Sequence, residues 1–432
     1  MKTNVNAVIG VQWGDEGKGR VVDYLAQDAD LVIRFQGGDN AGHTVINDKG
    51  KFALHILPSG VFNPETMNIV SAGTVVNFDT MHNEIAHIEE ASGYKVENLF
   101  IDERAHLILP YHIALDGAEE GKRDASQKIG TTKRGIGPCY QDKAARSGIR
   151  AADLLDEERL KKRLEMALPK KNRDLEYYGL KTFTLEEILD KCRAWKAEFG
   201  DKIIDSIPVV REAVESNKKV LLEGQLGIMR DNDWGIYPYT TSSNPTVAGG
   251  CNGAGIPPRA INKVYGVAKA YSTSVGGGPY MTELFDADGD KLRDIGHEYG
   301  ATTGRPRRCG WFDAVAADYA CYMNGITDLA LTKLDVLDTF EKIKVCTGYM
   351  IEGEYYTNLP ETRLQEKAKP IYAEFDGWMC DTTKCRKYED LPQNAKVLIE
   401  ELEKFLKTPI TIISVGPERD QLILRDSPLS AK

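Results

Sequence analysis

The chain has 432 residues, of which 42% are apolar and 28% charged, a balance typical of a globular protein with a sizeable core. Its formal net charge of −10 argues against a general nucleic-acid or membrane-surface partner, because a net anionic surface repels polyphosphates unless basic residues gather locally. The sequence shows no secretion leader, no stretch near the roughly 18 apolar residues of a membrane span, and no CxxC pair among its eight cysteines. We therefore expect a cytoplasmic protein with reduced thiols.

Short apolar runs alternate with helical patterns along the chain. An apolar run at 5–11 ends in a glycine-rich turn, which a helical pattern at 20–27 follows. Further strand-like runs lie at 31–35, 68–71, 219–223, 263–270, 329–334 and 410–414, with helical patterns at 313–323 and 394–406. This alternation predicts an α/β fold with a large, mostly parallel central sheet that helices cover on both faces.

Residues 150–218 differ in composition from the rest of the chain. They are rich in charged, helix-forming residues, as in LLDEERLKKRLEMAL and LEEILDKCRAWKAEF. We interpret them as a helical excursion within a single domain of residues 1–432, and their charges as a solvated helical face without a catalytic role.

The first glycine-rich loop reads GDEGKG at 14–19, directly after a predicted strand and before a helix. Exposed backbone N–H groups and the helix dipole can hold an anion at such a place, which makes the unit similar to a P-loop NTPase. The loop departs from the standard motif, because six residues instead of four separate Gly10 from Gly17, and Gly19 replaces the magnesium-binding Ser/Thr. Asp15 offers a hard oxygen ligand instead. GKG alone would also fit an ordinary turn with a solvated lysine.

The second loop reads QGGDNAGHT at 36–44 and follows the next predicted strand. A lone histidine is more often structural than catalytic. His43, however, lies among three glycines with little apolar sequence to bury it, at a strand end where α/β enzymes place ligands. We therefore favour a functional role for this imidazole.

Eight segments together carry a family resemblance. They read GDEGKG, GGDNAGHT, IGTTKRGIGP at 129–138, GIYPYTTSSNPTVAGG at 235–250, VGGGP at 275–279, TTGRPRR at 302–308, LTKLDVLD at 331–338 and SVGPER at 414–419. In content and order they resemble adenylosuccinate synthetase from residue 5 to about 420. One such loop would be weak evidence, whereas eight in family order make coincidence implausible.

The resemblance implies GTP-dependent ligation of L-aspartate to inosine monophosphate (IMP) through a 6-phosphoryl-IMP intermediate. The products would be adenylosuccinate, GDP and phosphate, in the first committed step from IMP to AMP in purine nucleotide biosynthesis. The C6 oxygen of the purine is a poor leaving group, and phosphorylation lets it leave readily. That oxygen gains charge when the N1 proton is lost; Asp15 matches the family's base, and His43 would stabilise the oxyanion.

The resemblance also assigns the substrate sites. The implied GTP site consists of Gly14, Asp15, Glu16, Gly17, Lys18, Gly19, Gly42, His43, Thr44, Arg307, Lys333, Asp335, Ser414 and Gly416. The implied IMP site consists of Asp15, Lys18, Asn40, His43, Gly130, Thr132, Arg146, Gln225, Thr241, Val275 and Arg305, and the aspartate site of Arg134, Thr302, Thr303 and Arg305. The implied cofactor is Mg²⁺, bound by Asp15 and the carbonyl of Gly42. Arg146 would come from the neighbouring subunit, which implies a homodimer.

The chemistry of two segments agrees with these assignments. A carboxylate such as Asp335 can accept both the N1–H and the 2-amino hydrogens of guanine, which adenine does not offer in that arrangement. Three arginines within 305–308 of an acidic protein suit an anion, and guanidinium groups bind carboxylates in a bidentate manner. Considered alone, Lys333 and Asp335 would also fit an ordinary surface Lys/Asp pair, and the segment 302–308 would fit a generic basic loop.

The sequence departs from the family pattern at two places, and of two alternative functions it disagrees with the first and leaves the second open. Where the family usually reads EGAQG, residues 223–227 read EGQLG, so Gln225 stands one place early and Leu226 occupies the place of the glutamine. Lys133 stands where a glycine is usual. A GTPase-like switch protein would have a regular GxxxxGK[ST] and no use for His43 or the arginine segment. A sister ligase for another purine monophosphate or amine donor would keep every catalytic residue, so the sequence leaves it open.

Overall fold

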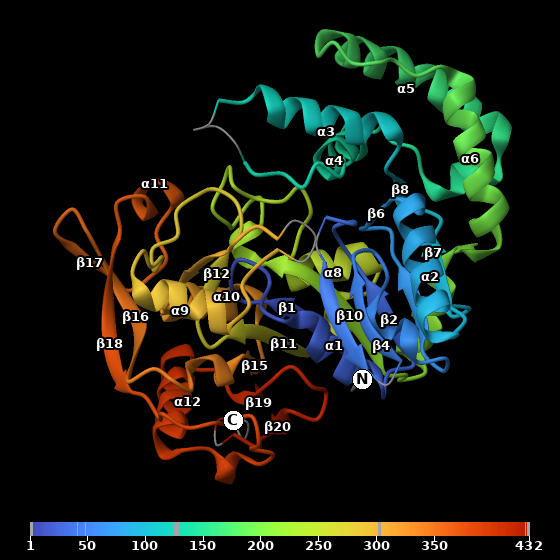
Figure 1. Ribbon diagram of the computed structural model, residues 1–432. Coiled ribbons are helices and arrows are strands. Elements are labelled where there is room, and N and C mark those ends of the chain that lie inside the picture. Colours follow the sequence, from blue (N-terminus) through green and yellow to red (C-terminus); the bar gives the residue numbers. More distant parts are fainter. Residues whose placement is uncertain are drawn as a thin grey trace.

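The computed structural model describes residues 3–40, 42–47, 49–124, 129–300, 304–427 and 429. Within this part of the chain a ten-stranded sheet forms the centre, in the order β20-β19-β15-β11-β1-β10-β2-β5-β7-β9 (Figure 1). Its strands are β1 (Val5–Gly10), β2 (Leu31–Arg34), β5 (Met67–Val70), β7 (Leu99–Asp102), β9 (Ile203–Ile204), β10 (Val220–Gly227), β11 (Ile261–Lys269), β15 (Asp328–Thr332), β19 (Ile410–Ser414) and β20 (Leu422–Leu424). Only β20 pairs in the antiparallel sense. The predicted mostly parallel α/β sheet is confirmed.

Both faces of this sheet are apolar because its central strands are buried on both sides. In β1, Val5, Ala7 and Ile9 pack into one hydrophobic cluster and Val8 into another, as the alternation of side chains along a strand requires. Helix α1 (Lys18–Ala26) covers the second face with Val21 and Val22. This two-sided burial explains why the strands appear in the sequence as short, continuous apolar runs.

The remaining helices surround the sheet (Figure 1). They are α2 (Phe78–Ser92), α3 (Pro110–Lys122), α4 (Ile136–Ala145), α5 (Glu157–Tyr177), α6 (Leu185–Phe199), α7 (Ser206–Glu215), α8 (Val247–Ala254), α9 (Ala287–Ile295), α10 (Ala314–Asn324), α11 (Thr362–Gln365) and α12 (Gln393–Leu406). Helix α3 packs against α4 and α5, and α5 against α6, so that these four gather at the top of Figure 1. None of the described helices is both long and apolar enough to cross a membrane.

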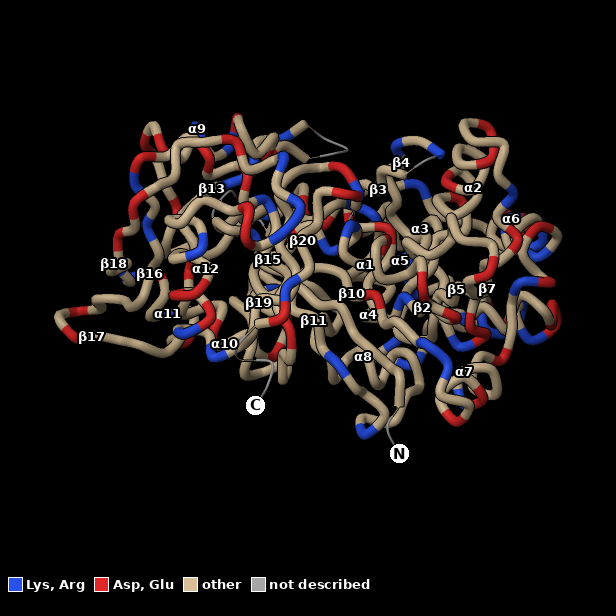
Figure 2. Tube along the Cα trace, turned by 90° about the horizontal axis from the view of Figure 1, so that it is seen from below, with Lys and Arg blue, Asp and Glu red and all other residues tan. Residues whose placement is uncertain are grey.

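The charged span 150–218 folds into α5, α6 and α7 with short 3-10 turns. Helix α5 buries Leu160, Leu164, Leu168 and Leu175 along one stripe, while most of its charged side chains are exposed. Figure 2 shows basic and acidic residues interspersed along the outer elements, α6 and α7 among them. The span is not helical throughout, because β9 lies within it and pairs with β7 of the central sheet.

Smaller sheets complete the fold. They are the hairpin of β3 (His43–Asn47) and β4 (Gly50–Leu54), the pair β6 (Val75–Val76) and β8 (His106–Leu107), the pair β12 (Ser272–Ser274) and β13 (Arg308–Gly310), and a sheet of β14 (Phe312–Asp313), β16 (Lys342–Ile351), β17 (Glu354–Tyr356) and β18 (Lys369–Asp376). The first two glycine-rich loops follow the carboxyl ends of β1 and β2, the edge at which open α/β sheets bind ligands.

Candidate active site

The first loop connects β1 to α1, as predicted, and a buried carboxylate braces it from inside. Glu16 is fully buried, accepts hydrogen bonds from the N–H groups of Gln12 (3.1 Å) and Gly14 (2.8 Å), and forms an ion pair with Lys18. Burial alone would raise the pKa of Glu16, but the Lys18 ammonium and the backbone donors hold it below its usual value. The side chains of Glu16 and Lys18 therefore hold each other within the loop.

Asp15 takes a different orientation from its neighbour Glu16. It has a left-handed backbone with φ 59°, and its side chain stays 32% exposed. Its Oδ2 lies 3.3 Å from Nε of Arg307, which comes from the arginine segment of the sequence. The first loop thus presents one partly exposed carboxylate, held beside a guanidinium group.

The first and second loops meet at Gly19. A Cβ atom at Gly19 would lie 2.3 Å from Cδ2 of His43, so the imidazole rests against the first turn of α1 where another residue would have a side chain. His43 is the first residue of β3, a position that the sequence assigned to a loop. The contact places His43 directly beside the segment that contains Lys18, as a site shared by the two loops requires.

His43 is held from behind by a hydroxyl and a buried carboxylate. Its Nε2 lies 2.9 Å from Oγ of Ser59, which donates to Oε1 of Glu223 at 3.1 Å. Ser59 therefore accepts from Nε2–H of the imidazole. Burial, together with the nearby Arg34 and other cations, lowers the pKa of His43 to about 3. The imidazole is neutral near pH 7, so it can act as a hydrogen-bond donor rather than as a cation.

Gln225, in β10, contacts the second loop although it stands one place early in the sequence. Its Nε2 donates to the carbonyl of Gly38 (3.2 Å) and to Oδ1 of Asn40 (3.3 Å), and its buried Oε1 has no hydrogen-bond partner among the described residues. Leu226 instead faces the first loop, with a left-handed φ of 61° and its Cδ2 3.3 Å from a Cβ built at Gly14. Gln225 and Asn40, both predicted to bind IMP, thus lie together.

Further predicted IMP residues approach the same region from three loops. Gly130 packs closely on the chain beside Val275, since a Cβ at Gly130 would lie 3.2 Å from Cα of Gly276. Oγ1 of Thr241 lies 3.3 Å from Oγ of Ser243, which donates to Oε1 of Gln36, the first residue of the second loop, at 3.1 Å. Thr132 and the unusual Lys133 are exposed, and Lys133 has a left-handed φ of 57°.

The three arginines of the predicted anion-binding segment have different surroundings. Arg305 is exposed, whereas Arg307 pairs with Glu298 (Nη1–Oε2 2.6 Å) as well as with Asp15. Arg308 forms an ion pair with Glu283 and donates to the carbonyl of Gly278 at 2.9 Å. Arg307 and Arg308 therefore already contact protein carboxylates. Thr302 and Thr303 lie outside the described residues.

Glu298 is a functional candidate that the sequence analysis missed. Its carboxylate is fully buried and pairs with Lys269 (2.8 Å), with Lys333 (3.1 Å) and with Arg307, while the hydroxyl of Tyr271 donates to it. Burial alone would raise its pKa, but the three cations hold it well below its usual value. One carboxylate thus connects the arginine segment to the predicted guanine segment. The sequence signal that could have identified Glu298 was its position just before TTGRPRR.

The predicted guanine-binding residues form a second group beside the first loop. Thr332, at the end of β15, donates to the carbonyl of Glu16. Asp335 follows within a 3-10 turn (Leu334–Leu337), and its buried Oδ1 has no hydrogen-bond partner in the described part of the chain. Burial raises the pKa of Asp335, and Lys333 offsets part of that rise. A buried carboxylate oxygen without a donor is costly unless a ligand supplies one.

The remaining predicted positions lie around these groups. Ser414, at the end of β19, accepts from Nη1 of Arg20 on α1 (2.7 Å) and donates to the carbonyl of Gly416 (3.3 Å). These contacts bring the end of β19 to the first turn of α1. Arg134 pairs with Asp39 of the second loop at 3.5 Å, and Thr44 is exposed on β3. Arg146 is exposed and ends α4.

The oxygen ligands fit a magnesium ion that arrives with a nucleotide. The described residues contain no cluster of three or more His, Cys, Asp or Glu side chains able to hold a metal ion alone. Mg²⁺ commonly takes one or two protein oxygens and completes its shell with phosphate and water. Asp15, exposed at the loop, and the carbonyl of Gly42, next to His43, are a donor set of that kind.

A phosphate-type loop, a guanine-type carboxylate and a glycine-rich second loop at the same edge of a parallel sheet define a nucleotide-dependent α/β enzyme. The sequence profile of the family described as adenylosuccinate synthetase matches residues 7–423. The chain belongs to the adenylosuccinate synthetase family.

Individual relatives agree with the family profile. The adenylosuccinate synthetase of Dehalococcoides mccartyi strain BAV1 is 49% identical over 423 residues, which are 98% of this chain and 100% of that protein. The enzyme of Fusobacterium nucleatum is 48% identical over 418 residues, covering 96% of this chain and 98% of its own length.

Solved structures agree as well. The fully ligated adenylosuccinate synthetase of Plasmodium falciparum superposes with a TM-score of 0.92 at 40% identity, covering 98% of this chain and 100% of that one. The cyanophage S-2L succinoaminodeoxyadenylate synthetase, bound to dGMP and dATP, has a TM-score of 0.63 at 18% identity over 100% of this chain and 97% of that one. The second likeness concerns the fold alone.

Proposed function

We propose that this enzyme joins L-aspartate to IMP at the expense of GTP and forms adenylosuccinate, GDP and phosphate. The observation that carries the proposal is the meeting of the two loops at Gly19, which sets His43 against the nucleotide loop of Asp15 and Lys18. Family membership over residues 7–423 supports the same activity.

The proposed reaction has two steps. Asp15 accepts the N1 proton of IMP, and the C6 oxygen attacks the γ-phosphoryl group of GTP, so that GDP leaves and 6-phosphoryl-IMP remains. The amine of aspartate then attacks C6, the C6–O bond breaks, and phosphate leaves and takes up the proton that the amine loses. When bound, Mg²⁺ would neutralise phosphate charge, with Asp15 and the carbonyl of Gly42 as its protein ligands.

His43 would stabilise the negative charge on the C6 oxygen and the transferring phosphoryl group with a hydrogen bond. In the structure its Nε2–H already donates a hydrogen bond to Ser59. Donation to substrate therefore requires the imidazole to leave Ser59 or to carry its proton on Nδ1. We propose that Ser59 and Glu223 hold the neutral ring in place until substrate competes for that proton.

The choice of GTP would rest on Asp335. Its unpartnered Oδ1 can accept a hydrogen bond from the guanine N1–H or 2-amino group, which offsets the cost of burying the carboxylate. Lys333, held by Glu298, would lie beside it, and Ser414 and Gly416 would complete the guanine site. Adenine presents an acceptor at N1 and would leave the carboxylate unpaired.

We further propose that Arg305, with Arg134, binds the carboxylates of aspartate, and that Thr302 and Thr303 join this site. Arg305 is exposed and belongs to the segment that places Arg307 beside Asp15, so an anion at Arg305 would lie near the reacting centre. The active form would be a homodimer, to which Arg146 of each subunit contributes across the interface. The eight cysteines, all within the described part of the chain, are free thiols, which suits the proposed cytoplasmic location.

A direct assay tests the reaction. The purified enzyme receives IMP, L-aspartate and Mg²⁺ with either GTP or ATP, and adenylosuccinate and phosphate are measured. We expect equal amounts of the two products with GTP, and little product with ATP. Product from GMP or dGMP but not from IMP would reassign the purine, in line with Leu226 and Lys133, and hydrolysis indifferent to IMP and aspartate would refute ligation.

A further inference from the structure

The inserted helix α5 reaches the end of α4 through a buried ion pair. Lys171 on α5 is buried, and its ammonium group lies 2.7 Å from Oδ1 of Asp142 on α4. Nε2 of His112 on α3 lies 2.9 Å from the other oxygen, Oδ2. Burial alone would raise the pKa of Asp142, but the hydrogen bonds from His112 and Lys171 hold it below its usual value. One ionised carboxylate on α4 is thus held by two other helices.

The same aspartate organises the turn that contains Arg146. The backbone carbonyl of Asp142 accepts hydrogen bonds from Ser147 N (3.0 Å) and Gly148 N (3.1 Å), and the N–H of Arg146 also caps the helix end. Arg146 itself has a left-handed φ of 62°, a conformation that a residue with a side chain adopts only when its surroundings hold it there.

Helix α5 supports this turn on its far side as well. The guanidinium of Arg163 donates to the carbonyl of Gly148, and its Nε lies 3.2 Å from Oδ2 of Asp153. Contacts from one helix therefore lie on both sides of Arg146, at Asp142 and at Gly148. The Arg146 side chain is exposed, and within the described residues its guanidinium has neither an ion pair nor a hydrogen bond.

We propose that α5 positions Arg146 for the active site of the neighbouring subunit, with Lys171 and Arg163 as the positioning residues. The inference rests on the proposed donation of Arg146 across a homodimer and gives the charged insertion a task in that reaction. Loss of Lys171 should impair the partner's site and leave the site of its own subunit intact. A residue that merely stabilised its own subunit would impair that subunit's site instead.

Mixed dimers separate these two roles. A subunit with Asp15→Asn has a dead site but donates a well-placed Arg146, whereas a Lys171→Met subunit has an intact site but donates a misplaced one. Two affinity tags isolate dimers with one subunit of each kind. We expect such dimers to show about half of the wild-type activity, because one of their two sites is complete. The Lys171→Met homodimer should lose roughly 10- to 100-fold in kcat/KM for IMP, with the KM for GTP unchanged.

Two controls keep the outcomes distinct. Lys170→Met removes the adjacent, exposed lysine of α5 and should leave the homodimer at wild-type activity. Mixed dimers of Arg146→Ala subunits with Asp15→Asn subunits test the donation itself. If these dimers do not recover activity, both the donation of Arg146 and the positioning role of α5 are refuted. The ligase activity is tested separately, by the direct assay with the wild-type enzyme. If the Arg146→Ala mixture recovers and the Lys171→Met mixture does not, the inference alone is overturned. Should Lys171→Met fail to form dimers, the less buried Arg163→Gln provides the same readout.

Discussion

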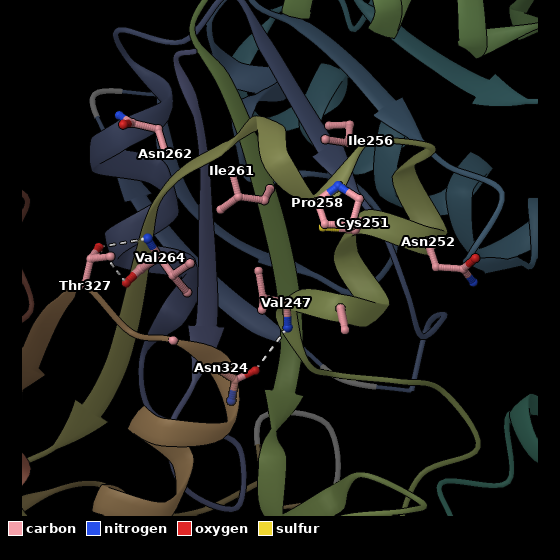
Figure 3. Close-up of a pocket in the computed structure, with 12 residues that line it drawn as sticks. Val247, Cys251, Asn252, Ile256, Pro258, Ile261, Asn262, Val264, Asn324 and Thr327 are labelled. Carbon is pink, nitrogen blue, oxygen red and sulfur yellow. Dashed lines mark hydrogen bonds between the residues drawn. The ribbon is translucent and has the colours of Figure 1, made fainter. Parts of the chain in front are cut away.

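Two regions of this enzyme at opposite ends of the same strands differ in volume and in charge. At the amino ends of β11 and β15 a cavity of about 570 Å³ opens between α8 and α10, as Figure 3 shows. It is lined by Val247, Ala248, Cys251, Asn252, Ile256, Pro258, Ile261, Asn262, Val264, Asn324, Gly325 and Thr327. Two of its polar side chains bind the backbone of the fold: Asn324 accepts from Val247 N and Thr327 from Val264 N, each at 3.0 Å.

The carboxyl ends of the strands, in contrast, hold a group of charged residues. There Asp15, Glu298 and Asp335 lie among cations, and the buried Oδ1 of Asp335 has no donor among the residues that the structure describes. No lysine, arginine, aspartate or glutamate is among the described residues that line the apolar cavity. Empty volume is therefore a poor guide to the reaction site of an enzyme whose substrates are anions, whereas clustered charge and unsatisfied polar atoms point to it.

The largest expected effect on the rate comes from removing the proposed base, Asp15, at the charged end of the strands. Asp15→Asn is almost isosteric and should lower kcat by on the order of 10²- to 10⁴-fold, because the amide cannot accept the N1 proton. Asn262→Ala, in the lining of the apolar cavity, is the matched control and should leave the rate unchanged. Steady-state kinetics with IMP, aspartate and GTP measure both, and a near-normal Asp15→Asn rate would refute the assigned role.

Removal of the Glu298 charge should have the next largest effect. Glu298→Gln leaves Lys269, Lys333 and Arg307 without their shared carboxylate, and breaking such buried pairs costs about 3–5 kcal/mol of the free energy of unfolding. We also expect the KM for GTP to rise by roughly tenfold or more, since Lys333 loses its anchor.

Denaturant titration and GTP kinetics measure these two effects. Glu283→Gln, which releases Arg308 instead, is the control and should leave the KM for GTP nearly unchanged. Equal effects of the two substitutions on the KM for GTP would argue against a special role of Glu298.

The guanine preference offers a narrower test at Asp335. Asp335→Asn replaces one acceptor oxygen of the carboxylate by an NH2 donor. The bound guanine should lose about 1–3 kcal/mol of stabilisation, so kcat/KM for GTP should fall roughly 5- to 150-fold. Xanthosine triphosphate, which presents a carbonyl where guanine has its amino group, should become the better substrate. Unchanged discrimination between the two nucleotides would place the guanine elsewhere.

The smallest expected effect concerns pH and stability. Burial lowers the pKa of His43 and of His106 to about 3, against 6.5 for an exposed histidine, so each takes up a proton on unfolding between these values. The free energy of unfolding should therefore fall as the pH drops from 6.5 towards 3, by at most about 1.4 kcal/mol per pH unit for each histidine. Urea titrations of the wild type and His43→Asn from pH 7 to 4.5 should differ in slope by up to this amount, whereas parallel curves would contradict it.

The strands and the loops that follow them were predictable from sequence. The run at 410–414 coincides with β19 (Ile410–Ser414), and α1 begins at Lys18, two residues before the predicted helix. Such elements depend on local pattern, since a strand buried on both faces must be apolar along its length. The meeting of the first two loops also followed, because the parallel strands of one sheet deliver their carboxyl ends to the same edge, here with β10 between β1 and β2.

The partners of the charged residues were not predictable. Glu298 pairs with Lys269 and Lys333, and Glu223 accepts from Ser59, 164 positions away, so no local pattern announces these contacts. The three arginines at 305–308 looked alike in sequence, and only the tertiary structure separates the exposed Arg305 from its neighbours. The same holds for Gln225, whose contacts with Gly38 and Asn40 join positions far apart in the sequence.

The bare first turn of α1 has one more consequence. Because the imidazole of His43 fills the space where residue 19 would have a side chain, a hydroxyl cannot be restored there without evicting that ring. A Gly19→Ser exchange would thus bring back the magnesium-binding hydroxyl of common NTPases only by displacing His43, the group proposed to polarise the purine. The two ways of building a phosphate loop are mutually exclusive in this scaffold, and no single exchange converts one into the other.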